Sequence, residues 1–150
     1  TRRYVQEVVR PALAEGARRT GRDATVPIAG YVITSVAEDG DRARRDAAAQ
    51  IAFYTVVRTY APLVELEGFT AEVDAIREAW QRRDAESMIA AVSPAMLERM
   101  AVAGTPQEAR EQMPAFHGLY DRLLCYVPSY GLTAAEIADR LDAVLATFGR

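Results

Sequence analysis

Two short runs of apolar and β-branched residues set the strongest limit on how this chain can fold. The first is Val26–Val36, bounded by Asp23 and by Glu38-Asp39-Gly40, and the second is Asp121–Val127. Both runs are apolar on both alternating faces, which is typical of strands in a parallel sheet that helices cover on each side. Two such strands cannot cover one another. The sequence therefore predicts further sheet beside them, supplied by residues before Thr1 or by another chain.

Helical patterns fill most of the remaining sequence. Residues 2–20 carry apolar side chains at helical spacing, and Pro11 within them should kink the helix or restart it. Residues 41–60 form a second helical pattern, and residues 63–103 are predicted to form shorter helices. Thr70 and Ser93 are the expected N-caps there, and Met100–Gly104 is only a short apolar stretch that ends in glycine. The order of elements predicts an α/β fold with parallel strands.

The last third of the chain contains two capping boxes, in which a threonine and a glutamate three residues later satisfy each other's backbone donors. Thr105 and Glu108 form the first, which starts a helix that runs to about Phe116. Thr133 and Glu136 form the second. The closing helix is expected to turn one apolar face to the core, and the residues on that face are Ile137, Leu141, Val144, Leu145 and Phe148.

Composition excludes several classes of function. There are 18 basic residues, all arginine, against 21 acidic ones, so the net charge is −3 and a basic nucleic-acid surface is not expected. No apolar run approaches the roughly 20 residues that a membrane-spanning helix needs. One cysteine and one histidine do not make a metal-ligand quartet, so we expect no metal site. We expect a cytoplasmic protein with neither a nucleic-acid nor a membrane partner.

The order and spacing of several stretches resemble the C-terminal portion of the luciferase-like monooxygenase superfamily, most closely its branch that depends on the deazaflavin coenzyme F420. The stretches that carry the resemblance are Tyr4–Ala17, Gly21-Arg22-Asp23, Ser35–Asp39, Ile51–Tyr54, Tyr60, Gly68-Phe69 and Val102–Ala109. Together with the final helix, strand and helix, the likeness spans nearly the whole chain.

The resemblance implies a (β/α)₈ TIM barrel of roughly 250 residues or more, of which this chain, as one domain over residues 1–150, supplies the last two strands and their helices. It also implies a hydride transfer on a small organic substrate, with coenzyme F420 or alternatively FMN bound at the barrel mouth. In the family, earlier strands carry most cofactor contacts and the acid/base side chain. We therefore name no catalytic residue in this chain, and we expect the chain to be inactive alone and to form a homo-oligomer, a dimer.

The alternative hypothesis is that this chain is a non-catalytic, truncated barrel module. Two strands that lack neighbours expose edges, and exposed edges pair readily with another copy of the chain. A bound chromophore would favour the oxidoreductase, whereas a colourless and intertwined dimer would favour the module.

In a barrel, functional residues lie at the carboxyl ends of strands and at the helix starts that follow them. For cofactor binding this selects Gly104 and Thr105, whose helix start offers backbone N–H groups to a phosphate or a ring carbonyl; helix capping alone is the competing interpretation. The candidates for substrate binding are Thr34, Ser35, Tyr126 and Tyr130. The two tyrosines could stack on a flat ring or simply pack.

Other conspicuous side chains are better explained by structure than by chemistry. Tyr54, Tyr60 and Trp80 lie at helical spacing and are expected to pack. His117 lies near the end of a helix, where the helix dipole stabilises it. Cys125 lies within an apolar strand, so we expect a buried and inert thiol.

Overall fold

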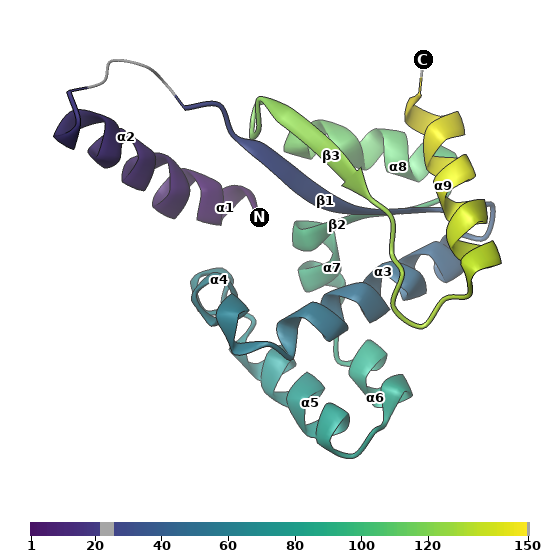
Figure 1. Cartoon of the computed structure of the whole chain (residues 1–150). Coiled ribbons are helices and arrows are strands. Elements are labelled where there is room, and N and C mark those ends of the chain that lie inside the picture. The colour runs from purple at the N-terminus through teal and green to yellow at the C-terminus, as the bar shows by residue number, and fades with distance from the viewer. Residues whose placement is uncertain (22–25, 150) are drawn as a thin grey trace.

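The computed structural model describes residues 1–21 and 26–149. Its centre is a parallel sheet with three strands, β1 (Ala29–Val36), β2 (Ala101–Gly104) and β3 (Arg122–Tyr126), in the order β2-β1-β3 (Figure 1). The expectation of an α/β fold with parallel strands is confirmed. The expected number of two strands is wrong, because Ala101–Gly104 pairs with Ile33–Val36 of β1. Four residues are too few for a pattern of alternating faces to show in the sequence.

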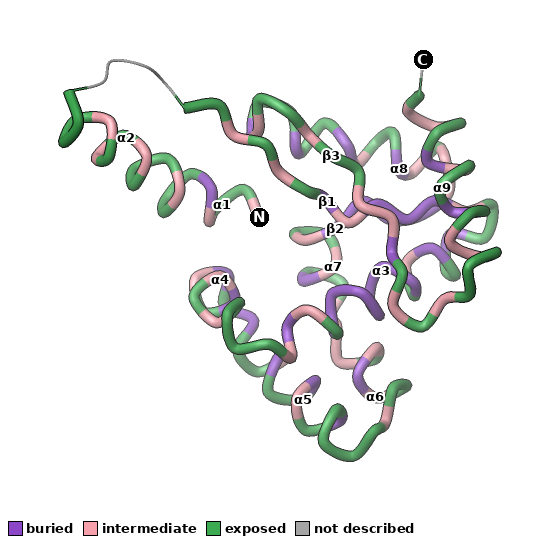
Figure 2. Tube along the Cα trace, in the orientation of Figure 1, coloured by how far each residue is buried: buried purple, intermediate pink, exposed green. Residues whose placement is uncertain are grey.

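Helices cover both faces of this sheet (Figure 1). Helix α3 (Gly40–Thr55) lies on the face that carries Ile33 and the alanines of β2, where it forms one hydrophobic core. Helices α8 (Pro106–Gln112) and α9 (Ala134–Phe148) lie on the other face, against Val32 and Val102 in a second core. Figure 2 shows the consequence, since the buried part of the chain is concentrated in α3 and in the carboxyl-terminal half of β1.

Strand β3 pairs with β1 and not with β2, so β1 is the central strand. The connection from β2 to β3 therefore crosses back over β1, in the direction opposite to the connection from β1 to β2. Right-handed crossovers in opposite directions place their helices on opposite faces of a sheet. This is why α3 and α8 do not share a face.

The expectation that the last strand is buried on both faces is wrong. Tyr31 of β1 is 71% exposed, and its partner Leu124 of β3 is 41% exposed. Cys125 is exposed too, which contradicts the expected buried thiol. The reason is that β3 has β1 as its single neighbour among the described residues, so its outer edge is open.

The chain begins with three helical segments in succession, α1 (Arg2–Tyr4), the π-helix η1 (Val5–Val9) and α2 (Arg10–Arg19). The irregularity expected at Pro11 is confirmed, because α-helical geometry resumes only at Arg10, with Pro11 in the first turn. Prolines and π-helical turns are both recognised causes of irregularity in a helix. The first strand begins at Ala29 and not at Val26, and Asp23, its expected boundary, lies outside the described residues.

Five short segments connect α3 to β2, namely η2 (Arg58–Tyr60), α4 (Ala61–Glu67), α5 (Thr70–Gln81), α6 (Ala85–Ala90) and α7 (Pro94–Met100). The pattern over residues 41–60 is interrupted because α3 ends at Thr55 and Val57 is extended. The predicted cap at Ser93 is confirmed, whereas the residue that precedes α5 is Phe69 and not Thr70.

The helix expected from Thr105 to about Phe116 divides at Met113 into α8 and η3 (Met113–Phe116), with Pro114 in the first turn of η3. The apolar face expected on the closing helix is only partly buried, since Val144 is buried but Leu141 and Leu145 are 47% and 56% exposed. Among the described residues, no helix is long and apolar enough to cross a membrane.

Candidate functional site

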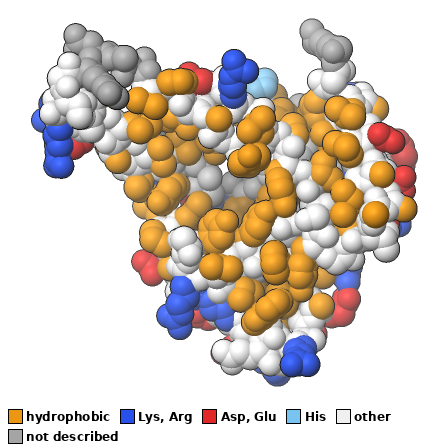
Figure 3. Space-filling model, in the orientation of Figure 1, with side chains coloured by type: hydrophobic (Ala, Val, Ile, Leu, Met, Phe, Trp, Pro, Cys, Tyr) orange, Lys and Arg blue, Asp and Glu red, His pale blue; other side chains and the backbone are white. Residues whose placement is uncertain are grey.

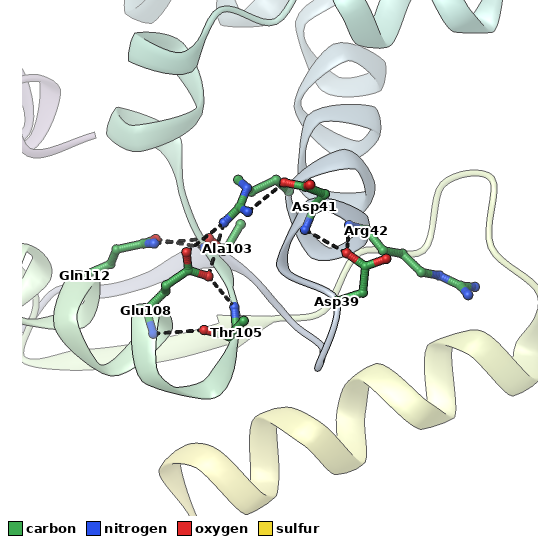
Figure 4. Close-up of polar contacts among 8 residues, drawn as sticks. Asp39, Asp41, Arg42, Ala103, Thr105, Glu108 and Gln112 are labelled. Carbon is green, nitrogen blue, oxygen red and sulfur yellow. Dashed lines mark hydrogen bonds and ion pairs between the residues drawn. The ribbon is translucent and has the colours of Figure 1, made fainter.

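The carboxyl end of β2 leads directly into α8 through Gly104 and Thr105, the residues expected to bind a cofactor. The predicted capping box is confirmed: Thr105 Oγ1 accepts from the N–H of Glu108 at 3.3 Å, and Glu108 Oε2 accepts from the N–H of Thr105 at 2.7 Å (Figure 4). The first backbone donor of this helix start is therefore already bound to a carboxylate of the same chain.

A network of side chains holds Glu108 in that position. Arg44 of α3 donates to Glu108 Oε2 at 3.1 Å and to Asp41 at 2.7 Å (Figure 4). The backbone N–H of Thr105, followed by its hydroxyl and then by Arg44, lowers the pKa of Glu108 below its ordinary value. Gly104 has a φ of 153°, and a Cβ at this position would lie 2.5 Å from Glu108 Oε2. The space beside Gly104 is therefore occupied by the side chain of Glu108.

Gln112 ties the preceding residue of β2 to the same helix. Its Oε1 accepts from the N–H of Ala103 at 2.9 Å, and its Nε2 donates to the Ala103 carbonyl oxygen at 3.1 Å (Figure 4). An edge strand of four residues gains two hydrogen bonds in this way. Hydrogen bonds from Gln112 and Glu108 therefore hold the end of β2 against the start of α8.

Thr34 and Ser35, two of the residues expected to bind substrate, lie in the interior with no exposed surface. Thr34 Oγ1 donates to the Val32 carbonyl oxygen at 2.9 Å. Ser35 Oγ is buried and has no hydrogen-bond partner among the described residues. Neither side chain is accessible to a ligand in this arrangement.

A buried ion pair links α3 and α9 beside the carboxyl-terminal half of β1. Arg140 Nε donates to Asp46 Oδ2 at 2.8 Å, and each side chain is 8% exposed. Arg140 Nη2 is buried as well and has no partner among the described residues. The pair is therefore excluded from water but not fully satisfied. Loss of either partner is costly because the other charge would stay buried and unpaired.

Tyr126, at the carboxyl end of β3, lines a cavity of about 350 Å³ on the α3 side of the sheet. Its ring lies 6.1 Å from that of Tyr31 and 6.0 Å from that of Tyr54, and Tyr54 in turn stacks on Tyr60 at 5.8 Å. Burial, and after it a hydrogen bond with Tyr126, raises the pKa of the Tyr54 hydroxyl. In Figure 3, apolar side chains surround a hollow on this face of the molecule.

Tyr130 lies in a different place, in the segment between β3 and α9. Its ring stacks on Phe53 of α3 with centroids 4.5 Å apart and an interplanar angle of 15°. It lines a second cavity, of about 580 Å³, together with Trp80 and Arg83. The structure therefore brings part of the expected site together: Thr34 and Ser35 lie beside the end of β2, where Ser35 pairs with Ala103, but their side chains are buried. Tyr126 and Tyr130 line two separate cavities.

Sequence reasoning missed that Tyr31, Tyr54, Tyr60 and Trp80 line cavities. Tyr54 and Tyr60 do pack against other rings, as expected, but they also border open space. The available signal was the number of tyrosines, seven in 150 residues, which is more than the number of phenylalanines. Buried tyrosines need a partner for the hydroxyl and so gather where polar groups or water are close.

His117 is exposed at the end of η3, apart from both cavities. Over residues 1–21 and 26–149, no group of three or more His, Cys, Asp or Glu side chains could hold a metal ion.

Comparison with known proteins defines the class to which this parallel α/β fold belongs. The model of the luciferase-like monooxygenase family matches residues 2–123, which is most of the chain. The chain belongs to this family, as the resemblance in the sequence implied. A search of curated proteins found no match.

Among solved structures, the fold is similar to that of a coenzyme F420-dependent tetrahydromethanopterin reductase from Methanopyrus kandleri. The TM-score is 0.68 at 23% sequence identity, and the match covers 90% of this chain but only 39% of that one. The likeness supports the expectation of part of a barrel fold. This chain thus spans well under half the length of that relative.

Proposed function

We propose that this chain is the C-terminal part of a luciferase-like oxidoreductase that transfers a hydride to or from a small organic substrate. The observation that carries the proposal is the family match over residues 2–123. The fold shared with an F420-dependent reductase, whose chain is much longer, supports a role as part of a larger barrel. Coenzyme F420 is the proposed cofactor and FMN the alternative. Either one, when bound, supplies the hydride chemistry.

The residues at the carboxyl end of β2 do not form an open cradle for such a cofactor. The N–H of Thr105 is bound to Glu108, and Gly104 has no free space beside it. A phosphate at this helix start would have to displace a carboxylate that Arg44 also holds. Cofactor contacts by Gly104 and Thr105 therefore stay a prediction, and we assign the main contacts to earlier strands of the barrel.

Tyr126 and Tyr130 remain the proposed substrate-facing residues, because both line cavities. Thr34 and Ser35 remain predictions for a rearranged, whole barrel, since they lie in the interior here. The cytoplasmic location also stays a prediction.

The test begins with the intact mass of the gene product made from its own start codon. If a longer chain is found, it is titrated with F420 and with FMN, and binding is followed by the absorbance of each cofactor, with the 150-residue chain as the control. We expect the longer protein to bind F420 and the 150-residue chain to bind neither. Tighter binding of FMN would replace the cofactor, and a longer protein that binds neither would refute the oxidoreductase.

The exposed face of β3 favours one further candidate, a non-catalytic module that associates with a second copy of itself. Tyr31 and Leu124 present apolar surface on this face, and the outer edge of β3 is open among the described residues. Light scattering after size-exclusion chromatography tests this candidate. A colourless dimer that Leu124→Lys converts to a monomer would support it, whereas a monomer would exclude it.

A further inference from the structure

The cavity of about 580 Å³ that contains Tyr130 is formed by two parts of the chain that are distant in sequence. One is the stretch from the end of α5 into α6, and the other is the segment after β3. The residues that line it are Trp80, Gln81, Arg83, Ala85, Met88 and Tyr130. A volume of this size lies within the range of about 300–1,000 Å³ that is typical of small-molecule sites.

One wall of the cavity is held in place by a buried glutamine. Gln50 of α3 is 1% exposed, and its Oε1 accepts from the N–H of Ser129 at 2.8 Å and from the N–H of Tyr130 at 3.0 Å. The same segment is fixed a second time by the stacking of Tyr130 on Phe53 at 4.5 Å. Tyr130 is therefore preorganised, which lowers the entropic cost of binding a ligand against it.

The lining also includes Trp80, which is 42% exposed and whose ring centroid lies 6.3 Å from that of Phe53 in an edge-to-face arrangement. An indole that is only partly covered leaves aromatic surface available for stacking. Two aromatic side chains, Trp80 and Tyr130, thus border the same cavity. Such an arrangement suits a flat ring.

Arg83 supplies the charge of this cavity. It is the one residue other than glycine with a positive φ among the described residues, 57°, and its N–H donates to the Trp80 carbonyl oxygen at 3.0 Å. A left-handed conformation costs an L-residue about 1–2 kcal/mol, and glycine forms the same helix end at lower cost. What arginine adds at this position is its guanidinium group. Conformational strain of this kind is often found at functional sites.

The guanidinium of Arg83 is available to a ligand. It is exposed and forms no ion pair with the described residues. The carboxylate next to it in sequence, Asp84, accepts from the N–H and the hydroxyl of Ser87 as the cap of α6. No Asp or Glu is among the described residues that line the cavity.

We infer that this cavity binds a planar aromatic anion, with its ring between Trp80 and Tyr130 and its carboxylate or phosphate on Arg83. The inference rests on the proposed function in one respect, the assignment of Tyr130 as a substrate-facing residue, and it adds the class of ligand that this cavity takes. Because residues of this chain alone line the cavity, binding to the 150-residue chain can fail while the longer protein still binds its cofactor, so the two failures are distinguishable. Arginine is suited to this task, since its planar group pairs with both oxygens of a carboxylate.

The experiment uses three probes that separate ring from charge: 2-naphthoate, its neutral analogue 2-naphthamide, and the non-aromatic anion cyclohexanecarboxylate. Affinity is measured by calorimetry on the 150-residue chain. Trp80 is the only tryptophan, so its single indole N–H signal in a proton–nitrogen spectrum reports whether the probe reaches this cavity. We expect 2-naphthoate to bind about tenfold more tightly than either analogue and to shift that signal, because one charge-assisted contact and one stacking contact each contribute about this much.

Three variants complete the test. Arg83→Gln should weaken 2-naphthoate about tenfold and leave 2-naphthamide unchanged, whereas the neighbouring Arg82→Gln, which does not line the cavity, should change neither. Arg83→Gly should weaken 2-naphthoate as well while making the chain more stable, so a loss of binding cannot be attributed to unfolding. Equal affinity for 2-naphthoate and 2-naphthamide, an unchanged affinity in Arg83→Gln, or an unmoved indole signal at saturation would each overturn the inference.

Discussion

Removal of Asp46 should show how strongly the fold depends on the buried ion pair between α3 and α9. Asp46→Ala leaves the Arg140 guanidinium buried, with its partner at 2.8 Å gone and both side-chain positions only 8% exposed. Breaking a buried pair in this way costs about 3–5 kcal/mol of unfolding free energy. Since Arg140 Nη2 already lacks a partner among the described residues, the pair is incompletely satisfied, and we expect a value near the lower end, about 3 kcal/mol.

The assay is urea and thermal unfolding, followed by circular dichroism. For a chain of this size a loss of 1 kcal/mol lowers Tm by about 2–4 °C, so the expected decrease is about 6–12 °C. Glu86→Ala is the matched control, because its pair with Arg45 is exposed on both sides, and it should leave Tm unchanged.

The double variant Asp46→Leu with Arg140→Met tests whether a buried, unpaired charge is the cause of the lost stability. If burial of charge is what makes the single variant costly, replacing both charges with apolar side chains should recover most or all of the lost stability. The explanation fails if Asp46→Ala is as stable as the wild type, or if the double variant is less stable than Asp46→Ala alone.

Three further predictions concern Gly104, Glu108 and Arg83. Gly104→Ala should lower the free energy of unfolding in urea by about 1–3 kcal/mol, because φ is positive there and the new Cβ would lie 2.5 Å from Glu108 Oε2. Gly16→Ala is the control and should raise the free energy of unfolding by about 0.5–1 kcal/mol, because Gly16 lies in a helix with open space around it. Equal effects of the two variants would contradict this prediction. The pKa of Glu108 is lowered by Thr105 in the folded state, so its contribution is present above the ordinary value of 4.5 and is lost as the pH falls below it. Melting curves from about pH 6 to about pH 3 should therefore fall less steeply for Glu108→Gln than for the wild type, and parallel curves would refute the assignment. Arg83→Gly should raise Tm by a few degrees, since about 1 kcal/mol of backbone strain is relieved, and a lower Tm would show that the turn is not strained.

The features that sequence predicted well are those that depend on contacts within a few residues. Both capping boxes were predicted correctly, because a threonine and a glutamate three positions apart satisfy each other without help from the rest of the fold. The effect of Pro11 was predictable for the same reason, since the missing N–H belongs to its own helix.

The features that sequence did not predict depend on neighbours distant in the chain. Ala101–Gly104 becomes a strand only because β1 lies beside it, and Gln112 supports it from α8. Cys125 is exposed although its run is apolar, because burial requires a second neighbouring strand or a covering helix. The cavity around Tyr130 could not be predicted either, since Trp80 and Arg83, which line it with Tyr130, lie about fifty residues earlier, at the end of α5 and in the turn that follows.

Strand order is the largest of these non-local features, and it explains the exposed apolar surface. In a closed barrel each strand lies between its predecessor and its successor in the chain, and all helices lie outside. Here β1 has β2 on one edge and β3 on the other, so the outer edges of β2 and β3 are open among the described residues. Tyr31 and Leu124 are exposed on the pair that β1 and β3 form. Strands that a larger barrel adds at these open edges, together with their helices, would cover the apolar side chains that the three-stranded sheet leaves exposed.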